Sequence, residues 1–380
     1  MAGIYIHIPF CKLACHYCNF HFSTTLQLKT KLLDAIVKEI EIRKNFFQSD
    51  MKKSYSIDTI YFGGGTPSIL SRSEIEFILE KLRQHYDVSS TVEITLEANP
   101  DDLTKSYLTD LKEAGVNRLS IGIQSFDDDL LKYMNRAHTA EESWAAIQNS
   151  LTAGFESLNI DMIYGIPGLS TQQWETSLAD LIRLPVNHLS CYGLTIEPKT
   201  ALMDFIKKKK SAAPDDDLMV EQFMVASNFL EQNGFRHYEI SNYALNDQFS
   251  KHNTAYWKGE PYLGLGPSAH SYQNNVRSWN IANNANYIKA IENNKSYFES
   301  ENLAKTERFN EHIMTGLRTF WGINLDDIQQ NFGAVYKNHL ETQLHKIDPI
   351  HIKQMNDQTI KLSKTGWLWT DSILEQLFYD

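Results

Sequence analysis

Short apolar runs alternate with longer amphipathic stretches through the first half of the chain. The runs are rich in β-branched residues and nearly every position in them is apolar, which is typical of strands buried on both faces of a parallel sheet. Six strands are predicted, over residues 4–8, 59–62, 93–97, 118–123, 158–164 and 188–195. This succession of strand and helix units predicts an α/β fold, either a parallel barrel or an incomplete one.

The amphipathic stretches between these runs predict helices. Residues 24–47 repeat apolar positions at intervals of three and four. Residues 71–86 open with Ser71 and Glu74 in the spacing of a capping box. Residues 104–115 end in a glycine, which favours a helix C-terminus there.

Polar clusters follow the first four predicted strands. Three cysteines follow the first strand, and the segment Gly63–Pro67 (GGGTP) follows the second. The third and fourth strands run into residues 97–100 (EANP) and 124–126 (QSF). The carboxyl ends of parallel strands meet at one rim, where barrel enzymes place their chemistry. The sequence therefore predicts a functional site at this rim.

The pattern changes after about residue 207, and we expect three parts: a barrel over 1–206, a connecting region over 207–300 and a small domain over 301–380. The connecting region predicts a helix over 216–233 and one strand over 236–244. It continues into a stretch rich in asparagine and aromatic residues. The last part predicts an α+β winged-helix-like module, with two short strands around a turn at residues 364–366 and a terminal helix.

Charge and composition exclude several classes of protein. The net charge of −11 argues against a protein that mainly binds nucleic acid, because phosphate contacts need clustered Lys and Arg. The chain has no apolar run long enough to span a membrane and no signal-peptide pattern at its start. We therefore expect a cytoplasmic protein, with peripheral contact to the inner membrane face left open.

The chemistry centres on Cys11, Cys15 and Cys18, a C-x3-C-x2-C spacing. Four cysteines are too few for a disulfide scaffold, and a structural zinc site needs four protein ligands. The fourth, Cys191, lies in an apolar run, where we expect a buried side chain. A four-iron cluster held by three thiolates would leave one iron open to a small molecule.

These motifs resemble the radical S-adenosylmethionine (SAM) superfamily, and within it the coproporphyrinogen-dehydrogenase-like branch. The resemblance covers nearly all of the chain. It implies an incomplete (β/α)6 barrel and a 4Fe-4S cluster on the three cysteines, with SAM on the unique iron. The residues that match SAM-contacting positions are Tyr5, Tyr17, Gly64, Gly65, Thr66, Glu97, Gln124, Arg136 and Asp161. In the dehydrogenases, the last three help to hold a second SAM molecule.

Three features favour the haem chaperones of this branch over the dehydrogenases. The dehydrogenases carry a further cysteine where this chain has Phe20, and an N-terminal extension before the cluster motif. The segment 252–257 (HNTAYW) also matches an H-N-x-x-Y-W motif linked to haem binding. An imidazole can ligate haem iron while aromatic rings stack on the macrocycle. The candidate haem contacts are His252, Tyr256 and Trp257, with His237 and His270 in reserve.

The resemblance implies haem as cargo, haem-requiring acceptor proteins, among which respiratory enzymes are candidates, and an electron donor for the cluster. Monomer and dimer both stay open. One alternative is the oxygen-independent coproporphyrinogen III dehydrogenase itself. A second, of another class, is a metal- or haem-responsive regulator that uses the winged-helix-like module on DNA; the acidic charge disfavours it.

Overall fold

The computed structural model describes residues 1–48, 55–354 and 358–380. Its centre is a run of six parallel strands that stand side by side in the order of the sequence. They are β1 (Ala2–Ile8), β2 (Ile57–Gly64), β3 (Val88–Ala98), β4 (Arg118–Gln124), β5 (Ser157–Tyr164) and β6 (His188–Gly193). All six predicted strands are confirmed in place and direction, and the sheet does not close, so the barrel is incomplete.

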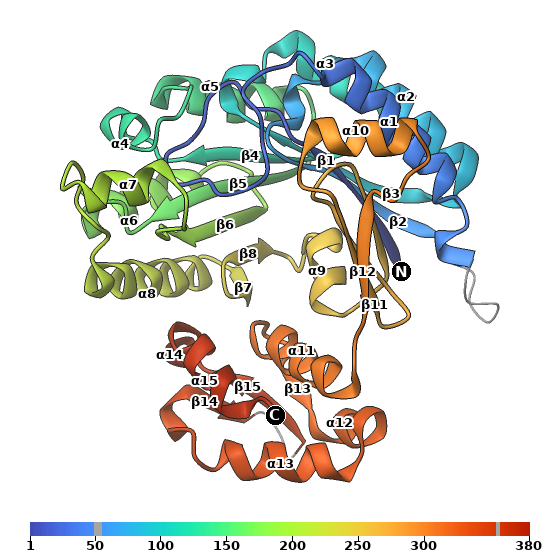
Figure 1. Ribbon diagram of the computed structural model, residues 1–380. Helices are drawn as coiled ribbons and strands as arrows, with labels where there is room; N and C mark the ends of the chain where they lie inside the picture. The colour runs from blue at the N-terminus through green and yellow to red at the C-terminus, as the bar shows by residue number, and fades with distance from the viewer. Residues whose placement is uncertain (49–54, 355–357) are drawn as a thin grey trace.

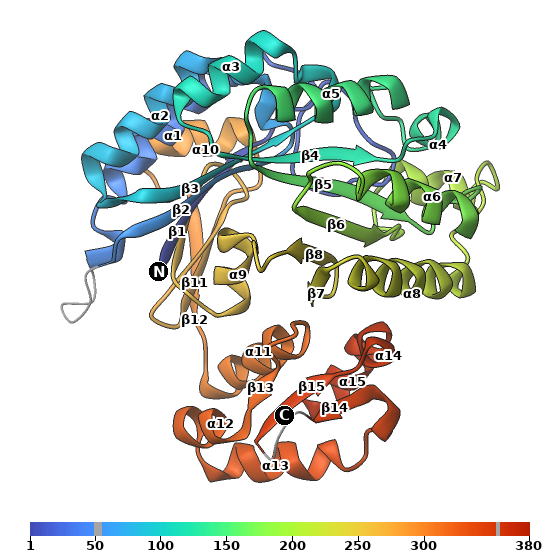
Figure 2. The same ribbon diagram turned by 180° about the vertical axis from the view of Figure 1, so that it is seen from behind.

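Amphipathic helices connect these strands and cover the outer face of the sheet (Figures 1 and 2). They are α1 (Lys29–Ile42), α2 (Arg72–His85), α3 (Lys105–Ala114), α4 (Asp128–Tyr133), α5 (Ala140–Thr152) and α6 (Thr171–Leu181). The predicted capping box is present, since the Ser71 hydroxyl accepts a hydrogen bond from the Glu74 backbone N–H and the Glu74 carboxylate accepts one from the Ser71 backbone N–H. Gly115 ends α3 with φ 97°, a left-handed conformation that suits glycine.

The connecting region extends the same sheet at both edges, and the sheet reaches twelve strands in the described residues. The added elements are α7 (Ala201–Lys207), α8 (Asp216–Gln232), β7 (Phe235–Glu239), β8 (Asn242–Leu245), α9 (Lys251–Trp257), β9 (Tyr262–Leu265), β10 (His270–Gln273), β11 (Val276–Asn280), α10 (Asn284–Glu292) and β12 (Phe298–Asn302). Strand β8 pairs antiparallel with β6, and β9 pairs parallel with β1. The single strand predicted over 236–244 is wrong: residues 240–241 turn the chain, and a hairpin of β7 and β8 forms instead.

The C-terminal domain combines helices with a separate three-stranded antiparallel sheet. Its elements are α11 (Lys305–Leu317), β13 (Ile323–Asn324), α12 (Leu325–Phe332), α13 (Ala334–Leu344), β14 (Ile352–Gln354), β15 (Thr359–Leu362), α14 (Lys364–Leu368) and α15 (Thr370–Leu377). The predicted turn at 364–366 between two strands is wrong. Ser363 accepts a hydrogen bond from the backbone N–H of Gly366 and so begins helix α14. Both strands of the hairpin precede this point.

The C-terminal domain lies across the inner side of the sheet, opposite the outer helices (Figures 1 and 2). It is attached at the β7–β8 turn, where the backbone N–H of Ile240 donates to Arg318 and that of Phe320 donates to Tyr238. The ring of Trp367 in α14 lies 4.4 Å from that of His237, edge to face. Among the described residues, no helix is both long and apolar enough to cross a bilayer.

One buried carboxylate ties the added strands to the first half of the chain. Glu39 of α1 is fully buried and accepts hydrogen bonds from the Tyr287 hydroxyl (2.5 Å), the Gly266 N–H (2.8 Å) and the Asn280 amide (2.9 Å). Burial raises the pKa of Glu39 to about 7, although these three donors oppose the shift.

This carboxylate predicts a pH-dependent stability. An acid whose pKa rises on folding destabilises the native state as pH increases from its ordinary pKa of 4.5 to about 7. The wild type should therefore lose on the order of 3 kcal/mol over this window relative to Glu39→Gln, which does not titrate. Thermal unfolding midpoints across the window measure this, with the exposed Glu41→Gln as control. Parallel pH profiles for the wild type and Glu39→Gln would contradict the prediction.

Candidate functional site

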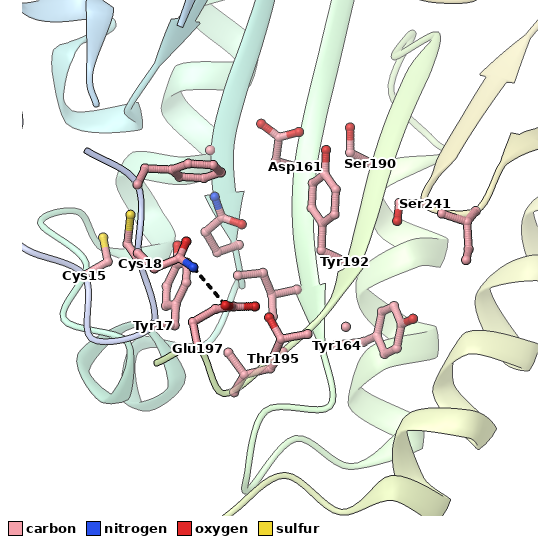
Figure 3. Close-up of a pocket in the computed structure, with 18 of the residues that line it drawn as sticks. Cys15, Tyr17, Cys18, Asp161, Tyr164, Ser190, Tyr192, Thr195, Glu197 and Ser241 are labelled. Atoms are coloured by element: carbon pink, nitrogen blue, oxygen red, sulfur yellow. Dashed lines mark hydrogen bonds between the residues drawn. The ribbon is translucent and has the colours of Figure 1, made fainter. Parts of the chain in front are cut away.

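A cavity of about 1120 Å³ opens at the carboxyl ends of the parallel strands and extends to the C-terminal domain. The cysteine loop forms one end of it, and Figure 3 shows Cys15 and Cys18 beside each other there. Helix α8 and the segment 367–372 form the outer wall. The predicted rim site is therefore a real cavity, and the C-terminal domain completes it.

The loop with the three cysteines is held at both ends and in the middle. The backbone of Cys11 donates to Ser23 (3.0 Å), Ser23 donates to Pro9 (2.8 Å), and His16 donates to Met134 (3.0 Å). Cys11, Cys15 and Cys18 are all half-buried and all line the cavity. Burial raises the pKa of the Cys18 thiol to about 11 and raises that of Cys11 as well. A bound cation would reverse this shift, since a coordinating thiol is deprotonated.

Arg136 links the cysteine loop to the barrel. Its guanidinium donates to the Cys15 sulfur (3.2 Å), to the Asn99 side chain (2.7 Å) and to the carbonyl of Gly122 (2.8 Å). The predicted residue is therefore at the site and contacts one of the three cysteines directly.

The glycine turn after β2 brings backbone close to the cysteine loop. Gly64 has φ 112°, and a β-carbon there would lie 2.6 Å from the His7 ring. A β-carbon on Gly65 would lie 2.7 Å from the carbonyl oxygen of Phe10 and 3.0 Å from the Cys11 sulfur. Only glycine fits this approach. The next backbone N–H, that of Thr66, donates to Phe10 (2.7 Å).

Glu97 lies at the end of β3 and faces the same cavity. It accepts hydrogen bonds from the Tyr61 hydroxyl (2.8 Å) and from the backbone N–H of Gly64 (3.2 Å). Burial, together with nearby Asp161, raises its pKa to about 7, although the Tyr61 and Gly64 donors and Arg118 oppose the shift. A carboxylate near its titration point at neutral pH can accept the hydrogen bonds of a polar ligand.

Gln124 and Asp161 extend the polar wall. Gln124 has φ 67° at a bulge in β4, a strained conformation for a residue other than glycine and frequent at functional sites. Asp161 accepts from Ser120 (3.1 Å) and Asn159 (2.7 Å). Burial raises the pKa of Asp161, which these bonds partly offset. Both residues line the cavity, as does Tyr17.

Tyr5 lies outside the cavity wall. Its ring stacks on Tyr61 with centroids 6.1 Å apart, and its hydroxyl is hydrogen-bonded to the His7 ring (3.1 Å). In this conformation Tyr5 supports the wall, and a direct contact with a cofactor stays a prediction.

Three residues of the HNTAYW segment lie outside the cavity wall, whereas Asn253 of the same segment lines it. His252, Tyr256 and Trp257 belong to α9, which packs against β1 and β2. The His252 ring is buried, with Nδ1 bonded to the Thr59 hydroxyl (2.8 Å) and Nε2 to the Tyr256 hydroxyl (3.0 Å). Neither nitrogen is free to bind iron in this conformation. To ligate iron, His252 would therefore have to break one of these two hydrogen bonds.

The reserve histidines differ from each other. His237 is buried and bonded to the Ser227 hydroxyl (3.0 Å) and the carbonyl of Ile240 (3.2 Å), whereas His270 is exposed beside Trp279. Cys191 is buried, as expected, and burial raises the pKa of its thiol.

Sequence reasoning missed the cavity residues that lie far from any motif. Arg118 begins β4, is 2 % exposed and carries a buried Nη2 without a hydrogen bond among the described residues. Arg318 and Trp369 line the cavity from the C-terminal domain. Arg118 is a charged residue at the start of an apolar run, so the sequence alone could have indicated it. The positions of Arg318 and Trp369 depend on how the domains meet.

Comparison with known proteins agrees with this geometry. The family model of the radical SAM superfamily matches residues 5–181, and that of the HemN C-terminal domain matches residues 303–372. The solved structure entitled "Coproporphyrinogen III oxidase (HemN) from Escherichia coli is a Radical SAM enzyme" superposes with a TM-score of 0.83, at 22 % identity over 99 % of this chain and 90 % of that one. This likeness shows a shared fold.

Two curated relatives decide the family. Heme chaperone HemW of Bacillus subtilis is 34 % identical over 88 % of this chain and 87 % of its own length. Heme chaperone HemW of Lactococcus lactis is 30 % identical over 99 % of this chain and 97 % of its own length. The chain belongs to the HemW family of radical SAM proteins. The resemblance stated from the motifs is therefore confirmed.

The residues at the site fit the iron–sulfur cluster that the radical SAM family implies. No His, Cys, Asp and Glu side chains among the described residues converge tightly enough for a single metal ion. A four-iron cluster does not require thiolates that converge on one point, because each thiolate binds a different iron. Three half-buried thiols on one loop, facing a cavity beside a glycine turn, meet that requirement.

We predict about four irons per chain in the anaerobically reconstituted protein. Cys15→Ala should lose most of this iron, because it removes one of three thiolates. The matched control is Cys191→Ala, which removes a buried thiol distant from the motif and should retain the iron. Iron and zinc analysis together with the visible spectrum check this. Stoichiometric zinc without a visible chromophore would refute the assignment.

We further predict that Glu97 gives SAM binding a pH dependence. A protonated carboxyl is the poorer acceptor, so affinity should fall as pH drops through about 7. Glu97→Gln should flatten this profile, and Glu97→Ala should weaken binding by about 1–3 kcal/mol. Calorimetric titration of the reconstituted protein measures both, with the exposed Glu141→Gln as control. A Glu97→Gln profile identical to the wild type would rule out this role.

Proposed function

We propose that this protein binds haem and hands it to haem-requiring acceptor proteins. The observation that carries the proposal is the identity of 30 % with Heme chaperone HemW of Lactococcus lactis along 99 % of this chain. Similarity that runs through the barrel, the connecting region and the C-terminal domain supports a common activity more strongly than a match of the barrel alone.

We further propose that Cys11, Cys15 and Cys18 hold a 4Fe-4S cluster whose fourth iron takes SAM. When bound and reduced, the cluster can supply one electron to the SAM sulfonium. The residues around it would have separate tasks. Arg136 would hold the loop and balance the charge of the cluster, Glu97 would accept hydrogen bonds from SAM hydroxyls, and Gly65 would let the backbone approach.

Phe20 argues against coproporphyrinogen dehydrogenase activity. It stands where the dehydrogenases of the resemblance carry a further cysteine, and its side chain is 69 % exposed at the cavity. An exposed apolar ring cannot ligate a metal or donate a proton. The chain thus keeps the cluster motif and replaces the dehydrogenase's extra thiol with a ring that can contact an apolar surface.

Two parallel assays on the anaerobically reconstituted protein test the function. We expect a haem Soret band that saturates on titration, transfer of that haem to an apo-acceptor such as an apo-cytochrome, and no decarboxylation of coproporphyrinogen. Heat-denatured protein with the same haem controls for passive release. Multi-turnover formation of protoporphyrinogen, or no haem binding at all, would contradict the proposal.

A further inference from the structure

The cavity has two chemically different halves. The inner half, along the parallel strands, carries ionisable and amide groups such as Glu97, Asn159 and Asp161. The outer half, toward α8 and the C-terminal domain, carries aromatic and aliphatic side chains such as Phe223 and Trp367. Ligand pockets usually measure about 300–1,000 Å³. The observed volume of about 1120 Å³ lies slightly above this range.

Exposed apolar side chains gather at this outer half. The large apolar residues that are most exposed and line the cavity are Leu13 (46 %), Phe20 (69 %), Tyr192 (42 %), Val220 (45 %) and Trp369 (60 %). Exposed apolar residues scattered singly need no explanation, but several that line one cavity indicate a binding surface. Figure 3 shows Tyr192 on the same strand as Ser190, between the cysteine loop and Ser241 in the β7–β8 turn.

The walls of the outer half come from opposite parts of the chain and are held in place. Phe20 lies on the loop after β1, whereas Trp369 lies between α14 and α15. Helix α14 is fixed, because the Trp367 indole donates to the Leu317 carbonyl (3.0 Å) and Lys364 donates to Asn228 of α8 (2.9 Å). The two aromatic walls therefore belong to a built cavity rather than to a mobile segment.

We propose that haem binds in this outer half, against Phe20, Tyr192 and Trp369, with a propionate at Arg318. This haem site rests on the proposed function and adds to it the location at which haem binds. A porphyrin is a flat apolar ring with a carboxylate edge, so aromatic walls match its faces and a guanidinium matches its propionates. Haem then lies beside the cluster in one cavity.

Arg318 lines the cavity from the C-terminal domain and can bind a propionate, although it also interacts with the buried Glu239. Arg318 is half-buried, and its partner Asp371 is 86 % exposed, so their ion pair is in contact with water and contributes little. A propionate can replace that carboxylate on the guanidinium at small cost. The acidic side chains of Glu197 and Asp216 also line the cavity and repel propionates. Glu197 is already bonded to Asn19 (2.8 Å; Figure 3).

The same geometry disfavours the HNTAYW segment as the haem site. The His252 ring contacts Thr59, near the amino-terminal end of β2, whereas the cysteine loop follows the carboxyl end of β1. His252 therefore lies behind the cavity wall, with its ring stacked on that of Tyr61 at a centroid distance of 5.0 Å. A chaperone must also release its haem. Haem in a cavity lined by exposed side chains can leave directly, whereas haem bound to the buried His252 ring could not.

Haem titration of the cluster-loaded protein, followed by the Soret band, tests this. Trp369→Ala combined with Phe20→Ala should raise the Kd by about tenfold or more, as expected when two aromatic walls are lost. Affinity is expressed per cluster-loaded chain. Ile350→Ala is the matched control, because Ile350 is 62 % exposed and does not line the cavity. It should bind haem as the wild type does.

A second comparison probes the propionate. Arg318→Gln should weaken binding of haem and leave binding of haem dimethyl ester, which lacks the carboxylates, unchanged. Asp371→Asn should strengthen haem binding slightly, since it frees Arg318. An equal loss for haem and the ester, or none for either, would overturn the role of Arg318.

The outcomes separate the two claims. If the wild type binds no haem, the proposed function fails. If the wild type binds haem and the Trp369/Phe20 double variant binds it equally well, the cavity site is overturned and the function survives. Loss of binding in His252→Ala, with full binding in the double variant, would likewise overturn the cavity site and move haem to α9.

Discussion

Six parallel strands that end at the same edge are the constraint on which this structure depends. Because β1 to β6 stand in sequence order, each loop that leaves a strand lies beside the loop that leaves the next. The cysteine loop, the glycine turn, Glu97 and Gln124 are separated by more than a hundred residues of sequence yet face one cavity. Their proximity follows from strand direction and order, and the helices on the outer face hold that order by burying its apolar side.

A buried polar network joins the cofactor side of the cavity to the C-terminal domain. Asn159 bonds to Asp161 (2.7 Å) and to the His188 ring (2.6 Å), and His188 bonds in turn to the Tyr238 hydroxyl (2.7 Å). The Tyr238 carbonyl accepts the backbone N–H of Phe320. Burial keeps the pKa of His188 well below its ordinary value, so the ring stays neutral in this chain of bonds. Both halves of the cavity therefore share one scaffold.

The sequence predicted the parts of the fold that local patterns determine. Continuous apolar runs located all six parallel strands, and capping residues located α2 and α3. Two predicted elements were wrong: Ser363 caps a helix where a turn was expected, and residues 236–244 form a hairpin instead of one strand. The pairing of β9 with β1 was not foreseen, because it joins residues that are far apart in sequence.

The residues of the site likewise divide into those that local motifs predicted and those that depend on the tertiary structure. Motif spacing located the cysteines, the glycine turn and Glu97, since these residues leave consecutive strands. It also suggested His252 as a ligand, because residue type and motif carry no information on burial. In the structure that imidazole has both nitrogens bonded. The outer wall at Arg318 and Trp369 belongs to no motif and arises only where the two domains meet.

The central claim is that one cavity holds the cluster and, beside it, the haem. Anomalous diffraction at the iron edge, from crystals of the cluster-loaded protein with haem bound, tests this most directly. The account predicts two iron positions in the same cavity: the cluster at Cys11, Cys15 and Cys18, and a single haem iron between Phe20 and Trp369. A haem iron at His252 in α9, with the outer half of the cavity empty, would contradict it.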